Sequence, residues 1–410
     1  MAGGPRDPGS PSWLLMVEDG ITGMWSWIAK DSSKLSVKEL IDAGRLPAPR
    51  SLLAGILLGL GLSVARLVLD AVVFKPLAAR ALGLKKIATP TPNSALNRAC
   101  AAKKNRPLTN LELEAAARDA GVSVEDARSY TRMMRLAAQQ EKQEYKFREA
   151  LFRCLAYLLL TCAGYYVAHD QPWFQDPFSE AMWLSPSTSK ADVHPNAIAS
   201  GAWPNVIIPK IFWFYQAGLG LYWHFIVFQF IDTKRSDFWQ MFIHHVVTLG
   251  LLITSWLGSW VQIGALIMLC HDVSDIFLEA AKLFNYLKKR HPWASYVADS
   301  VFFVFASVFM TTRLYLYPKY MLLNVIYTPY LSPRAHTFFG TLLGTLQVLH
   351  VFWFYLILRV IYNFLWHGVE EDVRSDDEGA GDDGHEQTDA GAPPCNGNGK
   401  AHASHRKKDD

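Results

Sequence analysis

The sequence predicts an all-α polytopic membrane protein with about seven transmembrane helices. Half of its 410 residues are hydrophobic and 13% are aromatic, which is more apolar surface than one soluble core of this length needs. Apolar runs of about 18 or more residues recur along the chain, and each is long enough to cross a bilayer. These runs cover residues 51–74, 150–167, 207–231, 238–257, 260–281, 296–317 and 338–365.

A polar stretch separates the first predicted span from the second. Within it, Thr109 and Glu112 have the spacing of a capping box that opens a helix, and Gly121 is expected to end that helix. A similar pattern at Ser123 opens a second helix, so residues 86–140 are predicted to form a small module with the outline of a helix-turn-helix. The second helix carries methionines, and no Asn or Gln, where adenine would be read. We therefore interpret the module as a scaffold beside the membrane, with DNA an unexpected partner.

The polar segments also differ in charge. Lysine and arginine concentrate in residues 75–153, 232–237 and 282–290, whereas residues 170–204 contain a single lysine and several acids. Positively charged loops stay on the cytosolic side of a membrane. This distribution predicts a luminal N-terminal segment over residues 1–50 and a cytosolic C-terminus.

Residues 368–410 are acidic and then rich in Gly and Asn, so they are predicted to form a disordered cytosolic tail. Ser375 precedes a run of acids and is a candidate phosphorylation site. Lys407 and Lys408 resemble a dilysine retrieval signal, which predicts residence in the endoplasmic reticulum membrane. The five cysteines show no CxxC motif and no zinc-binding spacing, so no metal site is predicted.

Ionisable side chains interrupt the fourth and fifth predicted spans, where the bilayer makes them costly. The fourth span holds two adjacent histidines, and the fifth holds five ionisable side chains within an arc of about 100° on one helix face. These residues are His244, His245, His271, Asp272, Asp275, Glu279 and Lys282. Because buried charges are paired or functional, the sequence predicts an active site here.

These segments also carry a family resemblance. The runs Phe230–Thr248 and His271–Tyr286 resemble the Lag motif of the ceramide synthases, which lies in a TLC domain. The resemblance extends over about Lys146 to Asp377, and it implies a barrel-like bundle of six helices over residues 146–367. The first span is similar to that of animal-type members.

The module at residues 86–140 resembles the homeobox-like insert of that family in a degenerate form. Tyr130 and Thr131 stand where the insert has a Trp-Phe pair, and Met133 takes the base-reading position. This departure argues further against a role in transcription.

The resemblance implies acyl transfer from a long-chain acyl-CoA to the amine of a sphingoid base, which forms (dihydro)ceramide. Acyl-CoA is the co-substrate, and no cofactor or metal is implied. An imidazole suits this chemistry as nucleophile or base, and carboxylates such as Asp272 and Asp275 suit the tasks of orienting it and accepting a proton. Two routes stay open, an acyl-imidazole on His244 or direct attack by an amine that a histidine deprotonates, and we favour the first.

Further candidates surround this catalytic set of His244, His245, Asp272 and Asp275. The substrate-binding candidates are His271, Glu279, Lys282, Arg313, Lys234 and Arg235. Lys234 and Arg235 are expected to meet the phosphates of CoA on the cytosolic side, and Glu279 and Lys282 are expected to pair at i,i+3. A loop over residues 318–334 is expected to close the luminal end of an acyl tunnel and to influence chain length.

Two other functions stay open from the sequence. A TLC-domain lipid carrier or translocation factor would tolerate neutral residues at the histidines and acids. The predicted spans contain His224, His244, His245, His271 and His350. A histidine–metal lipid hydroxylase would need more histidines than these. The sequence leaves open the acyl-chain preference and whether the chain forms a homo- or heterodimer.

Overall fold

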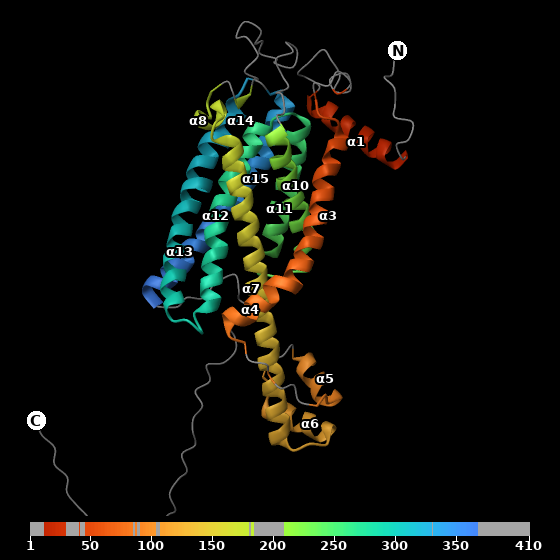
Figure 1. Ribbon diagram of the computed structural model, residues 1–410, viewed down its shortest axis with the longest axis vertical. Helices are drawn as coiled ribbons and strands as arrows, with labels where there is room; N and C mark the ends of the chain where they lie inside the picture. The colour runs from red at the N-terminus through yellow and green to blue at the C-terminus, as the bar shows by residue number, and fades with distance from the viewer. Residues whose placement is uncertain are drawn as a thin grey trace, which may run out of the picture.

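The computed structural model describes residues 12–29, 41, 46–84, 87, 91–103, 107–179, 182–183, 209–329 and 331–367. Every regular element within these residues is a helix (Figure 1). Seven of these helices are long and apolar enough to cross a membrane, which confirms the predicted fold class and number of spans. They are Pro49–Leu82, Val124–Ala168, Pro209–Phe228, Phe238–Leu257, Val261–Leu287, Trp293–Tyr327 and Pro333–Trp366.

The first span packs against the third through glycines. After α1 (Ser12–Ala29), it comprises η1 (Pro49–Ser51), α3 (Leu52–Leu69), η2 (Asp70–Phe74) and α4 (Lys75–Leu82). A Cβ atom at Gly59 would lie 2.8 Å from the carbonyl oxygen of Gly220 in α10 (Pro209–Phe228). Within a membrane, small residues let two helix backbones approach closely, so this contact fixes α3 against α10.

The polar module is a cluster of three helical segments at the lower end of the bundle in Figure 1. It consists of α5 (Ser94–Ala102), α6 (Asn110–Ala120) and the beginning of α7 (Val124–Ala168), packed around Leu96, Leu113 and Tyr130. The predicted capping box at Thr109 and Glu112 is present, and Gly121 ends α6 in the left-handed conformation at φ 65°. Lys103 and the Thr109 amide lower the pKa of Glu112 to about 2.

The second helix of the module and the second span form one continuous helix, α7, which sequence reasoning treats as two. The segment from Ser123 contains no glycine or proline before Gly164. Without a residue that ends the helix, the hydrogen-bonded ladder runs on from the polar module into the membrane. The module is therefore attached directly to the bundle.

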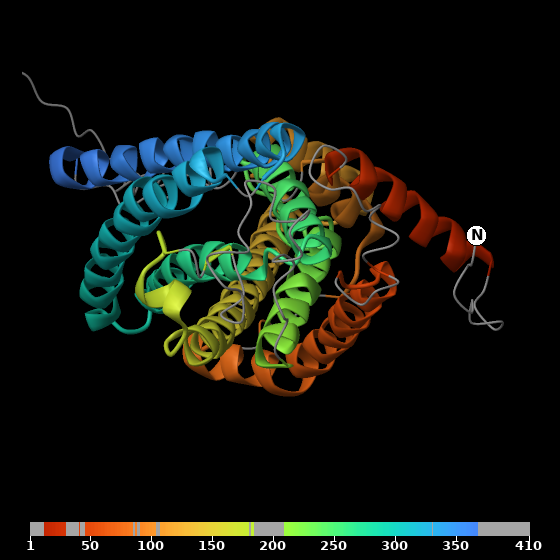
Figure 2. The ribbon, with the colours of Figure 1, turned by 90° about the horizontal axis from the view of Figure 1, so that it is seen from above.

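The other elements complete the bundle. Seen from above, α15 and the run from α13 to η5 form one edge, and α3 lies on the opposite side (Figure 2). Gly258 and Ser259 form a tight turn between the fourth and fifth spans, with Ser259 at φ 54°. The elements are α8 (Pro172–Gln175), α10, α11 (Phe238–Leu257), α12 (Val261–Leu287), α13 (Trp293–Phe309), η5 (Met310–Leu322), α14 (Leu323–Tyr327) and α15 (Pro333–His367).

The predicted loop over residues 318–334 is wrong in its extent. The sixth span continues through Pro318 as a π-helix and ends only at Tyr327, so the connection to α15 is short. The wider π-helical ladder accommodates the proline, which has no N–H to donate. Met321 and Val325 are buried on this helical extension.

Candidate active site

The two adjacent histidines lie in the middle of the bundle, within the first half of α11. Their side chains are buried, and the ring centroids of His244 and His245 lie 5.7 Å apart. The ring of His244 also lies 6.0 Å from that of His271 in α12 and 5.4 Å, edge to face, from that of Trp353 in α15. Three helices therefore contribute rings around His244.

Hydrogen bonds set the tautomer of His245. The side-chain nitrogen of Gln229 donates to the carbonyl of Phe238 at 2.8 Å, so the Gln229 oxygen faces the histidine. That oxygen lies 2.7 Å from Nδ1 of His245. Because a carbonyl oxygen only accepts, Nδ1 carries the proton and Nε2 keeps a lone pair. His245 is thus held as a base with a defined free nitrogen.

A second histidine pair joins α12 to α15. Nδ1 of His271 donates to the carbonyl of Ile267 at 2.7 Å, which leaves Nε2 of His271 as an acceptor. Nε2 of His350 donates to it at 2.8 Å. This contact is an interhelical hydrogen bond of the kind that polar side chains form within membranes.

The three acids of α12 differ in whether a basic side chain pairs with them. Asp275 accepts from Arg313 of η5 at 2.6 Å, and Arg313 also donates to the carbonyl of His271 at 2.9 Å. Asp272 is 1% exposed, and neither of its carboxylate oxygens has a hydrogen-bond partner among the residues that the structure describes. Glu279 and Lys282 form the expected i,i+3 pair at 2.7 Å.

Neither acid makes the contact with His244 that the sequence suggested. Nδ1 of His244 has no hydrogen-bond partner, and no bond joins it to Asp272 or Asp275 in the described part of the chain. Asp275 is instead neutralised by Arg313, and both side chains line a cavity of the bundle. A catalytic role for the two acids therefore stays a prediction.

Two cavities meet at the histidines. The larger, of about 170 Å³, is lined by His244, His245, Asp275 and Arg313, and it extends toward the end of the bundle where α11 begins. The smaller, of about 40 Å³, is almost entirely apolar and reaches the opposite end. Tyr222 lines both, so the larger cavity, which contains the charged side chains and is called the polar cavity below, lies next to the apolar one. His271 lines the apolar cavity but not the polar one. The walls of the apolar cavity also include Trp183, Trp260, Val325, Leu331 and Phe339.

Two residues of the polar cavity that the sequence did not indicate, Asp237 and Trp353, contact each other. Asp237 lies directly before α11, and Nε1 of Trp353 donates to its carboxylate at 3.1 Å. Trp353 follows His350 by three residues, so both lie on the same face of α15. The i,i+3 spacing from His350 is the sequence signal that could have indicated Trp353. Without it, a tryptophan that lines a cavity cannot be told apart in the sequence from one that faces lipid.

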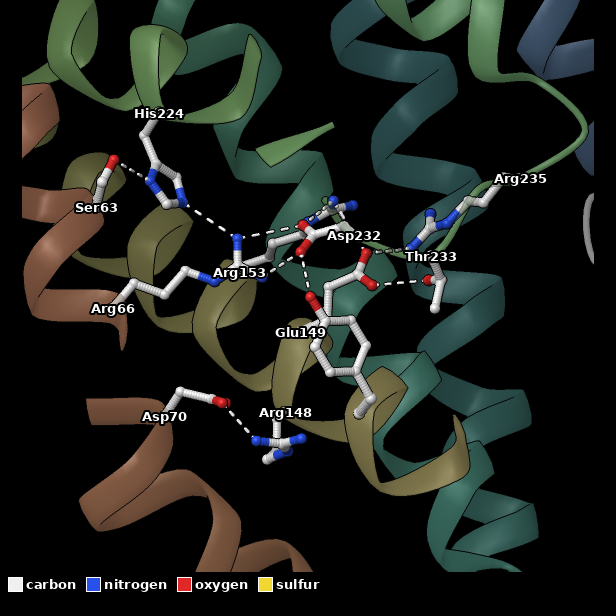
Figure 3. A network of polar contacts seen from close by, with 11 residues as sticks. Ser63, Arg66, Asp70, Arg148, Glu149, Arg153, His224, Asp232, Thr233 and Arg235 are labelled. Carbon is white, nitrogen blue, oxygen red and sulfur yellow. Dashed lines mark hydrogen bonds and ion pairs between the residues drawn. The ribbon is translucent and has the colours of Figure 1, made fainter. Parts of the chain in front are cut away.

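An ion cluster borders the cavity at this end (Figure 3). Asp232 accepts from Arg66 of α3 at 2.6 Å and from Arg153 of α7 at 3.1 Å. Glu149 accepts from Arg153 at 2.9 Å and from Arg235 at 3.2 Å. Arg153 and Arg235 line the cavity, so the loop between α10 and α11 is tied to two other helices at its mouth.

The two basic candidates in this loop differ in position. Arg235 is engaged by Glu149, whereas Lys234 is exposed and lies over the ring of Phe238 at 5.8 Å. Both lie near the cavity mouth, which is the position needed to contact the phosphates of an anionic ligand. Ser375, Lys407 and Lys408 lie outside the described residues.

Arg66→Gln is expected to destabilise the fold by about 3 kcal/mol, because Asp232 would lose its bidentate partner inside the bundle. Arg148→Gln is the matched control, since Arg148 also ties α7 to the first span, through the more exposed Asp70. Thermal unfolding in detergent should show a clearly larger loss for Arg66→Gln. Equal losses would contradict a special contribution of the buried cluster.

Comparison with known proteins identifies the family. A sequence model described as the TLC domain matches residues 146–359. Human ceramide synthase 5 is 31% identical over 384 residues, which cover 91% of this chain and 90% of that protein. The chain belongs to the ceramide synthase family.

Other relatives agree with this assignment. Human ceramide synthase 4 is 33% identical over 347 residues, which cover 82% of this chain and 80% of its own length. Human ceramide synthase 3 is 30% identical over 323 residues, or 77% of each chain. Within this ceramide synthase family member, the histidines and acids lie inside the matched TLC domain, whereas Arg66 of the ion cluster lies before it.

Proposed function

We propose that this protein transfers an acyl group from acyl-CoA to the primary amine of a sphingoid base and so forms (dihydro)ceramide. The observation that carries this proposal is the pair His244 and His245 in the wall of the polar cavity, which has an apolar cavity beside it. An amide-forming acyl transfer needs a nucleophile or base of near-neutral basicity, and imidazole provides both functions. Membership of the ceramide synthase family supports the same reaction.

In the favoured route, a ring nitrogen of His244 attacks the thioester carbon. The C–S bond breaks, CoA leaves as a thiolate that takes up a proton, and the acyl group is held on the imidazole. The amine of the sphingoid base then attacks the acyl-imidazole carbon, and the C–N bond to His244 breaks. The nitrogen of the base loses two protons in forming the amide: Nε2 of His245 has the free lone pair needed to accept the first, from the ammonium, and the second returns to the ring nitrogen of His244 that the acyl group leaves.

The cavity shapes suggest how the substrates lie. The polar cavity has charged walls that suit the thioester and the head group of the base, and the apolar cavity indicates the direction in which the acyl chain would extend. We place the polar mouth on the cytosolic side of an endoplasmic reticulum membrane, because CoA cannot cross a bilayer and the basic residues 232–237 and 282–290 lie at that end.

Exchange of residues 318–332 for the segment of a relative with different selectivity is expected to change the acyl-chain profile while activity persists. Val325 and Leu331 from this segment line the apolar cavity, so side chains of another size would change the length available to the chain. Products formed from a panel of acyl-CoAs would be measured by mass spectrometry. An unchanged profile in an active chimera would move the length-determining contacts to the other walls of the cavity.

The proposal is tested by incubating purified full-length protein with sphinganine and that acyl-CoA panel. N-acylated sphinganine should form with at least one acyl-CoA and should be absent when either substrate is omitted. A folded preparation that yields no N-acyl product with any acyl-CoA would contradict the proposal.

A further inference from the structure

Asp237 occupies the N-cap position of α11 but does not act as a cap. An aspartate at this position normally accepts a backbone N–H from the first turn, yet its side chain makes no such bond here. The residue is 3% exposed, and its carboxylate lies in the wall of the polar cavity. Capping of the α11 N-terminus therefore does not explain the presence of an aspartate at this position.

Asp237 also differs from the other carboxylates of the cavity wall in the described part of the chain. Asp275 is neutralised by Arg313 and Glu279 by Lys282. Asp299 is only half-buried and has an interaction of its own. Among the residues that the structure describes, Asp237 forms no ion pair, and its Oδ1 atom has no hydrogen-bond partner.

The basic side chains close to Asp237 in the sequence are directed elsewhere. Arg235 donates to Glu149, and Lys234 lies over the ring of Phe238. Among the described residues, the one hydrogen bond of the Asp237 carboxylate comes from the neutral indole N–H of Trp353 to Oδ2. A buried carboxylate held in this way is costly unless a cation reaches it.

The contact with Trp353 also links Asp237 to the catalytic candidates. The Trp353 ring packs against His244, and Asp237 precedes His244 by seven residues, which places both on one face of α11. Two helical turns separate them, a rise of about 10 Å. Asp237 thus lies between the cavity mouth and the histidines, where a substrate group would pass before it reaches His244.

We propose that Asp237 binds the cationic amine of the sphingoid base as it enters the cavity, an inference that rests on the proposed function. A primary alkylamine is protonated at neutral pH, as lysine is. It brings one positive charge and hydrogen-bond donors, which match the charge and the free Oδ1 of Asp237. The carboxylate selects a protonated amine over a neutral lipid of the same shape, and the amine loses its proton later, at His245.

The test compares wild type with Asp237→Asn, which keeps an oxygen for Trp353 but removes the charge. We expect the KM for sphinganine to rise about tenfold or more, equivalent to ~1.4 kcal/mol or more, with the KM for acyl-CoA unchanged. Asp237→Glu keeps the charge and should recover part of the affinity. A KM for sphinganine that stays at the wild-type value in Asp237→Asn would overturn the proposal.

A neutral analogue separates charge recognition from a packing effect. In this analogue a hydroxyl replaces the amine of sphinganine, and it is used as a competitive inhibitor. Its Ki should be the same for wild type and Asp237→Asn. A Ki that rises in parallel with the KM of sphinganine would show that the substitution acts through Trp353 and the cavity shape, which would also overturn the proposal.

Binding is measured independently of turnover by thermal unfolding with either lipid. Sphinganine should stabilise wild type more than the neutral analogue does, and the difference should vanish in Asp237→Asn. A preparation that shows this difference but makes no ceramide would contradict the proposed function and leave the binding inference standing. Equal stabilisation of wild type by both lipids would contradict the inference.

Discussion

His244→Ala is expected to lower the rate of sphinganine N-acylation by at least about a hundredfold, because the reaction would lose its nucleophile or its base. The fold should persist. Among the described residues, Nδ1 of His244 has no hydrogen-bond partner, so removal of the ring leaves no partner of that nitrogen unpaired. Activity and thermal unfolding would be measured on the same detergent preparation.

His291→Ala is a suitable control, since His291 lies in the turn between α12 and α13 and away from the cavity. It should keep normal activity. Full activity in His244→Ala would move the nucleophile to His245 or favour a lipid carrier, which needs neither histidine for chemistry.

Asp275→Asn is expected to destabilise the protein by about 3 kcal/mol and to abolish activity, because Arg313 would be left as a buried cation without its carboxylate. The double variant Asp275→Asn with Arg313→Gln removes both charges and should regain most of the stability but no activity. Thermal unfolding and N-acylation assays separate the two effects. A stability loss in the double variant equal to that of the single one would contradict this explanation.

Asp272→Asn provides the contrasting case. Its carboxylate has no partner, so the loss of its charge removes a desolvation penalty and should leave the stability equal or higher. A lower kcat at unchanged stability would show that the buried charge serves the reaction. Normal activity would remove Asp272 from the catalytic set.

Much of the fold could be predicted because hydrophobic runs and turn residues are local signals. The fourth span was predicted with its exact bounds, Phe238–Leu257, since Asp237 and the Gly258–Ser259 turn limit it on both sides. The sixth span was predicted too short. Pro318 normally indicates a helix end, and only the surrounding packing shows that a π-helix accommodates it.

The site was predictable in part for a similar reason. His244, His245 and the acids of α12 stand out in any apolar helix, because ionisable residues in a membrane are rare. The partners of these residues come from distant parts of the chain and carry no such signal. Pairing of Asp275 with Arg313, of His271 with His350 and of Asp237 with Trp353 depends on helix packing that a single sequence does not reveal.

The most direct test of acyl transfer through His244 is intact-protein mass spectrometry after rapid mixing with a long-chain acyl-CoA. Wild type should gain the mass of one acyl group, His244→Ala should gain none, and added sphinganine should remove the group and release N-acylated product at a matching rate. Formation of that product by wild type with no acylated protein at any time, or acylation of His244→Ala equal to wild type, would contradict a His244 acyl-enzyme.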